Sequence, residues 1–145
     1  MKKLYFSLLI FSFFTTVNAQ IVNIPDANFK AKLLEANTTN FIAKNLLGAF
    51  FKIDTNNDGQ IQESEALNVS YLDARRNQIS SLVGIEKFTN LKILDSSSNL
   101  LSSLDVSKLV NLTALDCSFN QLSTLDVTPL VKLTLLVCSY NHQRA

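Results

Sequence analysis

The chain has 145 residues, of which 47% are hydrophobic and 17% charged, with a formal net charge of +1. This length suits one domain with a substantial apolar core. The near-neutral balance lacks the basic surface that nucleic acids attract, so we expect no nucleic-acid partner.

Residues 1–19 have the pattern of a secretory signal peptide. Lys2 and Lys3 form a positive start, Leu4–Phe14 is apolar, and the small residue Ala19 is suited to a cleavage site. The apolar run is shorter than the roughly 20 residues of a membrane-spanning helix. We therefore expect a product that is secreted or held at the cell surface, with no transmembrane segment after cleavage.

Residues 20–68 are expected to form a small helical cap. Asp26 suits the positive end of a first helical turn, and Phe29 and Leu33 recur at helical spacing after it. The apolar stripe of such a helix would cover the end of the repeat array that follows. The next apolar segment, 41–53, is compatible with either a helix or extended chain.

One stretch of this cap, 54–65, reads D-T-N-N-D-G-Q-I-Q-E-S-E and matches the EF-hand calcium loop at each defining position. Its Gly allows the sharp turn, and an acid stands at the twelfth place, where a bidentate ligand is required. An Asx-rich turn without metal is the alternative, but such a turn does not need an acid there. We therefore expect calcium as a structural cofactor, bound by Asp54, Asn56, Asp58, Gln60 (through its carbonyl) and Glu65.

The segment 69–145 contains a leucine-rich repeat, clearest in L-T-A-L-D-C-S-F-N-Q-L at 112–122. Its asparagine recurs at intervals of 22, 21 and 21 residues, at Asn77, Asn99, Asn120 and Asn141. This period predicts an α/β solenoid, a short array with parallel strands on the concave face and extended or 3-10 return segments. We expect the asparagine amides to bond turn backbone that the strands leave unpaired.

Two cysteines, Cys117 and Cys138, occupy one inward position of consecutive repeats. Neighbouring strands lie about 4.8 Å apart, whereas the Cβ atoms of a disulfide need about 3.5–4.5 Å. We expect small buried thiols, with a disulfide as the alternative.

Outward positions of the strands are the candidates for contact with a partner. Phe119 and Tyr140 share a column, so their rings should stack in solvent, either as a binding hot spot or as a ladder that stiffens the sheet. Aspartates form a second column, whose like charges repel unless they are solvated or paired with nearby cations. The candidate partner-binding residues are Tyr71, Asp73, Arg75, Asp95, Asp116, Phe119 and Tyr140.

The array with L-D-C-S-F-N-Q-L-S-T-L-D-V resembles secreted bacterial leucine-rich repeat proteins of the internalin-like kind. The phrase L-V-G-I-E-K-F-T-N-L at 82–91 resembles their first repeat, and I-P-D-A-N-F and D-T-N-N-D-G resemble their cap. The resemblance implies recognition of a protein or glycan at a cell surface by the concave face. We expect no enzyme, because the only histidine is His142 and no nucleophile has a base within reach.

The repeat frame breaks after Asn141, where His142–Ala145 replaces an apolar continuation. Leu136 and Cys138 would then line an open edge, which repeat proteins normally cover. The sequence therefore predicts an array truncated at its C-terminus. Such a chain is the product of a truncated gene, a fragment of a longer surface protein without independent function, or one that associates end to end.

Overall fold

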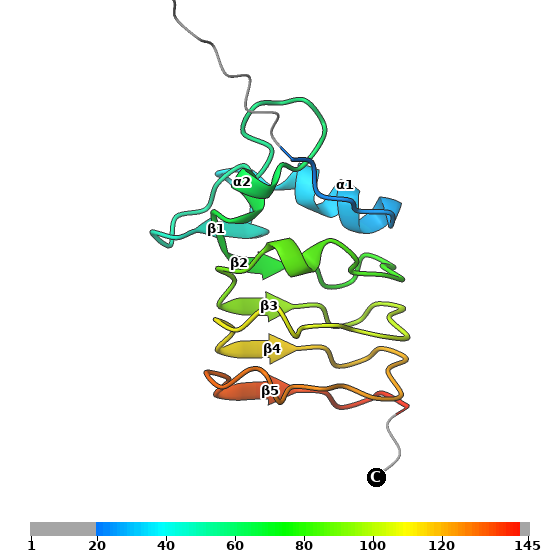
Figure 1. The fold of residues 1–145 in the computed structure, drawn as a ribbon. Helices are drawn as coiled ribbons and strands as arrows, with labels where there is room; N and C mark the ends of the chain where they lie inside the picture. Colours follow the sequence, from blue (N-terminus) through cyan, green and yellow to red (C-terminus); the bar gives the residue numbers. More distant parts are fainter. Residues whose placement is uncertain (1–19, 143–145) are drawn as a thin grey trace, which may run out of the picture.

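The computed structural model describes residues 20–142, so the expected signal peptide lies outside the described residues. Figure 1 shows five strands stacked as the rungs of a ladder, with a small cap at the N-terminal end. The strands are β1 (Ala43–Asn45), β2 (Val69–Asp73), β3 (Ile93–Asp95), β4 (Ala114–Asp116) and β5 (Leu135–Val137), and the helices are α1 (Ala27–Glu35), α2 (Glu63–Ala66) and the 3-10 helix η1 (Ile85–Lys87). In the described part, no helix has the length and apolar character needed to cross a membrane.

The cap is built on α1, which begins after Asp26. The carboxylate of Asp26 accepts a hydrogen bond from the backbone N–H of Phe29 at 2.9 Å and so caps the helix. Phe29 and Leu33 are buried and form the inner face of α1, as their spacing predicts. The loop 54–65 then leads into α2, where Glu65 closes a capping box with Gln62.

The apolar segment 41–53, whose sequence is compatible with either a helix or extended chain, is a hairpin. Strand β1 pairs antiparallel with β2, and Phe50 returns to pair with Lys44. In Figure 1, the loop of this hairpin projects to the left of β1. It adds an antiparallel edge to a sheet that is otherwise parallel, so the cap contributes directly to the sheet.

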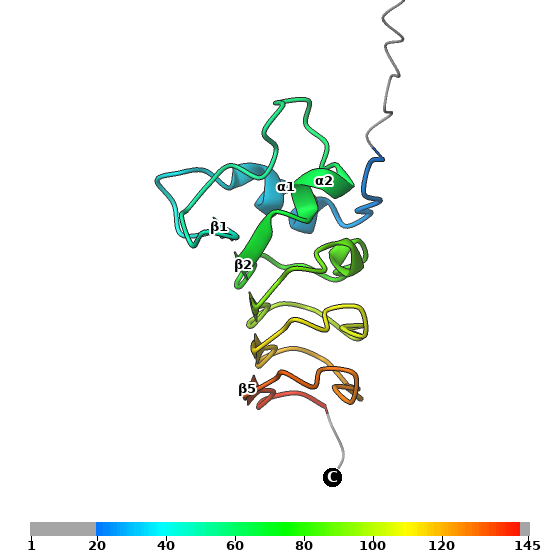
Figure 2. The ribbon, with the colours of Figure 1, turned by 60° about the vertical axis from the view of Figure 1, so that its left-hand side comes forward.

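Strands β2 to β5 are parallel, and each lies one repeat further along the chain. Leu72, Leu94 and Leu115 are partners in register, and all three are buried. Figure 2 shows the two layers of the array, the strands on one side and the return segments on the other. The described part of the chain therefore has the parallel-strand sheet of a leucine-rich repeat solenoid.

The asparagine column is structural, as predicted. The side-chain oxygen of Asn99 accepts from the backbone N–H of Asn77 at 3.1 Å. Its amide nitrogen donates to the carbonyls of Ala74 and Ser96 at 2.9 and 3.0 Å. One repeat on, Asn120 accepts from the N–H of Leu101, as Asn99 does from that of Ile79, and its amide donates to the carbonyls of Ser96 and Cys117. Asn99, Asn120 and Asn141 thus each tie the turn of their own repeat to the repeat before it.

The two cysteines are unbridged, as the strand spacing predicts. Cys117 lies in the core, and burial raises the pKa of its thiol to about 12. Cys138 is only partly buried, because among the described residues no strand lies on the far side of β5.

Candidate functional site

The outward face of the five-stranded sheet, here called the sheet face, corresponds to the concave face of the sequence analysis. Side chains alternate across a strand, so the buried leucines of β2, β3 and β4 turn their neighbours outward. The register places these outward residues in two rows that cross the strands. The first row is Tyr71, Ile93, Ala114 and Leu135, and the second row is Asp73, Asp95, Asp116 and Val137.

The first row continues into the cap. Lys44 is the partner of Tyr71 in β2, and Phe50 is the partner of Lys44. The Lys44 Nζ lies 4.8 Å from the ring centroid of Phe50 and 5.4 Å from that of Tyr71. The ring of Phe41 meets Phe50 edge-on, with centroids 5.1 Å apart. A row of six residues therefore crosses the whole sheet, with a cation between two aromatic rings near one end.

Several residues of this row were missed by sequence reasoning. Ile93 and Leu135 each precede an inward leucine, and that place in the repeat was a usable signal. Both side chains are exposed, by 41% and 57% respectively. Lys44 and Phe50 had no such signal, because only the tertiary pairing of β1 with β2 brings them to the sheet face.

The second row holds carboxylates that also organise the backbone. One carboxylate oxygen of Asp95 accepts from the N–H and hydroxyl of Ser97 at 3.0 and 2.6 Å. Asp116 makes the same pair of bonds to Ser118 at 2.9 and 2.6 Å. These aspartates therefore hold the turn that follows each strand, besides carrying charge.

The charges of this row are compensated unevenly. Arg75 Nε lies 3.1 Å from Asp73 Oδ2, and its Nη1 lies 3.5 Å from Asp95 Oδ2. Asp73 is only 8% exposed, so it offers a partner little surface. Within residues 20–142, Asp116 forms no salt bridge. One arginine thus serves two of the three carboxylates.

The predicted stack of Phe119 and Tyr140 is present at the end of the strands. The ring centroids are 4.3 Å apart, the planes meet at 10°, and the side chains are 53% and 73% exposed. Both residues have positive φ, 54° and 57°, as do Arg76 and Ser98 at the same place in earlier repeats. That conformation costs a non-glycine residue about 1–2 kcal/mol. The left-handed backbone conformation therefore does not explain why aromatic residues stand at positions 119 and 140.

The loop 54–65 curls around its own carboxylates. Asp54 accepts hydrogen bonds from the backbone N–H groups of Asp58 and Gly59, both at 3.2 Å. Glu65 accepts from the N–H and hydroxyl of Thr55 at 2.7 Å. Asp54 and Glu65 are buried, and neither forms a salt bridge in the described part of the chain.

The donor set of this loop suits calcium, which prefers carboxylate, amide and carbonyl oxygens. Its side chains instead satisfy one another: Asp58 accepts from the amides of Asn56 and Gln62 at 3.0 and 2.7 Å. The Gln60 side chain accepts from Lys30 Nζ at 2.7 Å, which leaves its backbone carbonyl as the ligand that the sequence predicts. No group of three or more His, Cys, Asp or Glu side chains in residues 20–142 is gathered as metal ligands would be.

The N-terminal segment joins this loop to the first repeat. The N–H of Val22 donates to the carbonyl of Ile61, and the N–H of Glu63 donates to the carbonyl of Gln20, both at 2.8 Å. A few residues later, the Asp26 carboxylate accepts from Ser80. The loop is therefore joined to the N-terminal segment by an isolated antiparallel bridge between Ile21 and Gln62.

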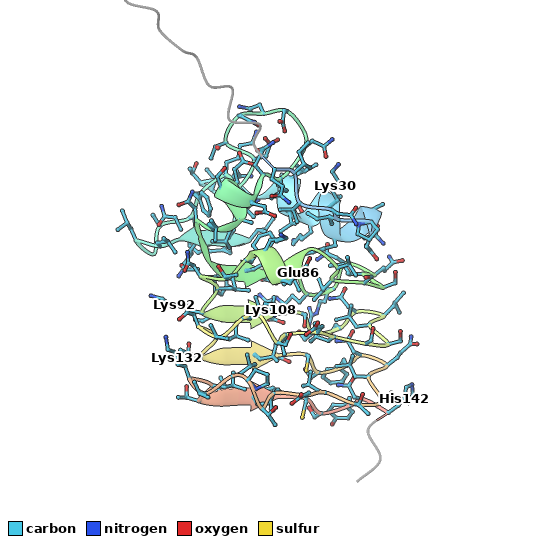
Figure 3. All side chains as sticks on the ribbon, in the orientation of Figure 1. Lys30, Glu86, Lys92, Lys108, Lys132 and His142 are labelled. Atoms are coloured by element: carbon cyan, nitrogen blue, oxygen red, sulfur yellow. The ribbon has the colours of Figure 1, made fainter. Side chains whose placement is uncertain are left out.

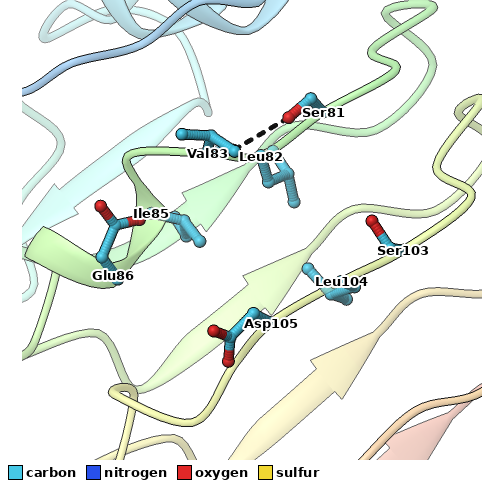
Figure 4. A pocket seen from close by; sticks show the side chains of 8 residues that line it. All are labelled: Ser81, Leu82, Val83, Ile85, Glu86, Ser103, Leu104 and Asp105. Atoms are coloured by element: carbon cyan, nitrogen blue, oxygen red, sulfur yellow. Dashed lines mark hydrogen bonds between the residues drawn. The ribbon is translucent and has the colours of Figure 1, made fainter.

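A hollow of about 310 Å³ lies between return segments of the first two repeats (Figure 4). The two carboxylates that line it already accept hydrogen bonds within turns. Glu86 accepts from the N–H of Gly84 at 2.8 Å, and Asp105 accepts from that of Ser107 at 2.9 Å. None of the predicted site residues lines it. This hollow is a consequence of repeat stacking and carries no site of its own.

Solved structures similar to this chain include two internalins of Listeria monocytogenes. The functional domain of InlJ, described as including a cysteine ladder, is 35% identical with a TM-score of 0.65, and the match covers 84% of this chain and 24% of that one. Internalin InlF is 22% identical with a TM-score of 0.60, over 88% of this chain and 34% of that one. The CBM51-2 and INT domains of ZmpB from Clostridium perfringens share the fold at 20% identity, with a TM-score of 0.53 and coverage of 74% and 20%.

The chain therefore spans about a quarter of the InlJ structure and a third of the InlF structure. Neither the family models nor the curated proteins compared with the sequence give a match.

Proposed function

We propose that this chain, an internalin-like leucine-rich repeat protein, is an extracellular recognition module that binds a protein or glycan through the sheet face. The observation that carries the proposal is the continuous outward row from Phe50 to Leu135, together with the exposed stack of Phe119 and Tyr140 after the ends of β4 and β5. Apolar and aromatic side chains gathered on one exposed face are the usual material of binding hot spots. Recognition, and not catalysis, is the activity that such a surface supports.

The loop 54–65 is proposed to bind calcium as a structural cofactor. Support comes from the EF-hand spacing and from two buried acids, Asp54 and Glu65, that no cation of the described chain neutralises. The ion would be held by Asp54, Asn56, Asp58, the Gln60 carbonyl and Glu65, and would supply the missing positive charge. The paired N-terminal segment would carry the resulting rigidity to the first repeat.

Cys117 and Cys138 are proposed as the counterpart of the cysteine ladder named for InlJ. They occupy one inward column of consecutive repeats and are not bridged. Since burial raises the pKa of the Cys117 thiol to about 12, this thiol is suited to packing and not to redox chemistry.

Site-specific photo-crosslinking tests which face is used. A photoreactive residue is placed either at Ile93 on the sheet face or at Lys108 among the return segments (Figure 3). Each variant is then incubated with intact cells of the producing organism. Partner adducts should form from position 93 and not from position 108. Equal labelling from both positions, or labelling from 108 alone, would overturn the proposal.

A further inference from the structure

The first row of the sheet face has a notch at β4. Ala114 lies between Ile93 and Leu135 in register, on strands about 4.8 Å apart. Its side chain ends at Cβ, whereas both neighbours are longer aliphatic chains that reach into solvent. Ala114 is therefore the short side chain of the first row between two exposed aliphatic ones, and this low point of the row is the notch.

An uncompensated carboxylate borders this notch. Asp116 is two residues further along β4, so its side chain lies on the same face about 6.8 Å away. Its Oδ1 accepts both bonds from Ser118, and its Oδ2 has no hydrogen-bond donor in the described part of the chain. Arg75, which pairs with Asp73 and Asp95, does not reach it.

We propose that the sheet face binds a polypeptide, and that a lysine or arginine of this partner lies over Ala114 with its charge on Asp116. An aliphatic stem that ends in a cation matches an apolar notch with a carboxylate at its border. This inference rests on the proposed function and selects a protein over a glycan. An acidic glycan would be repelled by Asp116, and a neutral glycan would leave that charge unpaired on binding.

The cap end of the row orients the same partner. Lys44 lies three strands from Ala114, about 14 Å along the row, and forms no salt bridge among residues 20–142. Its ammonium group is positive where Asp116 is negative. A partner segment with a basic residue at Asp116 therefore places an acidic residue toward Lys44, and the two charges fix one direction of binding.

Selection from a random 12-residue peptide library displayed on phage tests the chemistry of the partner. The immobilised full chain should enrich peptides that carry Lys or Arg next to apolar residues. Binding of the selected peptides should weaken at least tenfold with Asp116→Asn and with Ala114→Leu, and it should weaken as salt is raised. Asp116→Asn keeps an oxygen acceptor for Ser118, so the fold is retained.

Asp105→Asn is the matched control, because Asp105 accepts the same kind of turn bond, from Ser107, on the return side. This variant should bind the selected peptides within twofold of the parent chain. The inference is overturned if no peptide is enriched, if the enriched peptides lack a basic residue, or if both sheet-face variants bind normally. Binding of a soluble polysaccharide panel that Ala114→Leu abolishes, without peptide enrichment, would assign the face to a glycan. If crosslinking at Ile93 persists in either case, the proposed function stands although this inference fails.

Discussion

Asp26 accepts hydrogen bonds from both the backbone N–H and the hydroxyl of Ser80, 54 residues later in the chain, at 2.8 and 2.7 Å. The other oxygen of the same carboxylate caps α1 at Phe29. One side chain therefore fixes the start of the cap helix and its position on the first repeat.

Replacing Asp26 with alanine should lower the free energy of unfolding by about 2–3 kcal/mol, because a helix cap and charge-assisted bonds to the first repeat are lost together. Urea unfolding of the variant measures the change. Glu35→Gln, at the exposed end of α1, is the control and should change stability by less than about 0.5 kcal/mol. A loss as small as that for Asp26→Ala would mean that the cap docks without this carboxylate.

The same residue predicts acid sensitivity. Burial alone raises the pKa of Asp26, but the bonds from Phe29, Ser80 and Ser81 outweigh burial and hold the pKa below its ordinary value of 3.8. A carboxyl with a lowered folded-state pKa stabilises the fold above its unfolded pKa, and that stability is lost as pH falls through the folded pKa. Unfolding measured from about pH 6 to pH 3 should therefore show a steeper decline for the parent chain than for Asp26→Asn. Parallel declines would contradict this.

Calcium should raise the melting temperature of the parent chain. For a dissociation constant of about 10⁻³–10⁻⁴ M, 10 mM calcium would stabilise the fold by about 1.4–2.7 kcal/mol. Glu65→Gln should abolish the gain, because it removes the bidentate ligand. Glu63→Gln should retain it, since Glu63 pairs with Lys87 and is not a predicted ligand. Calorimetric scans with and without calcium measure the melting temperature. A parent chain whose melting temperature does not change with calcium would rule out the site.

Asn99→Ala should destabilise the array by about 3 kcal/mol or more, because it leaves buried backbone groups of two repeats without partners. Asn111→Ala is the matched control: in the described part of the chain its amide donates to the carbonyl of Thr89 and accepts an exposed bond from Lys132, and the cost should be about 1 kcal/mol. Equal losses of unfolding free energy, measured with denaturant, would show that Asn99 stabilises the fold no more than Asn111 does.

Phe119→Asn separates the two interpretations of the aromatic stack. Asparagine tolerates the positive φ, and that relief should offset the loss of about 0.5–1.5 kcal/mol of stacking with Tyr140. Stability should therefore change by less than about 1 kcal/mol, while crosslinking to a partner from Ile93 declines. A loss above about 2 kcal/mol with unchanged crosslinking would make the stack a structural ladder.

Cys117 should resist alkylation in the folded chain at pH 8, because a pKa of about 12 leaves about one thiolate in 10⁴. The partly buried Cys138 should react first. Mass spectrometry of chains treated with iodoacetamide measures both rates. Equal rates in the native state would contradict the burial of Cys117.

The candidate site was only partly readable from the sequence. The stack of Phe119 and Tyr140 follows from the repeat period alone, because equivalent positions of adjacent repeats must lie side by side. The burial of Asp73 does not follow from the repeat period. Asp73 is buried because Arg75 and the neighbouring hairpin lie against it. The contrast between paired Asp95 and unpaired Asp116 depends on how far one arginine side chain reaches.

By itself, the sequence determined the parallel strands, their register and the separate inward columns of leucine, cysteine and asparagine. These features repeat every 21 or 22 residues, so local spacing dictates which residues become neighbours. Tertiary structure alone decided that the hairpin of β1 joins the sheet and brings Lys44 and Phe50 beside Tyr71. The physical reason is that the pairing is non-local: a three-residue strand within an apolar segment has no period of its own, and only docking against β2 selects extended chain over helix.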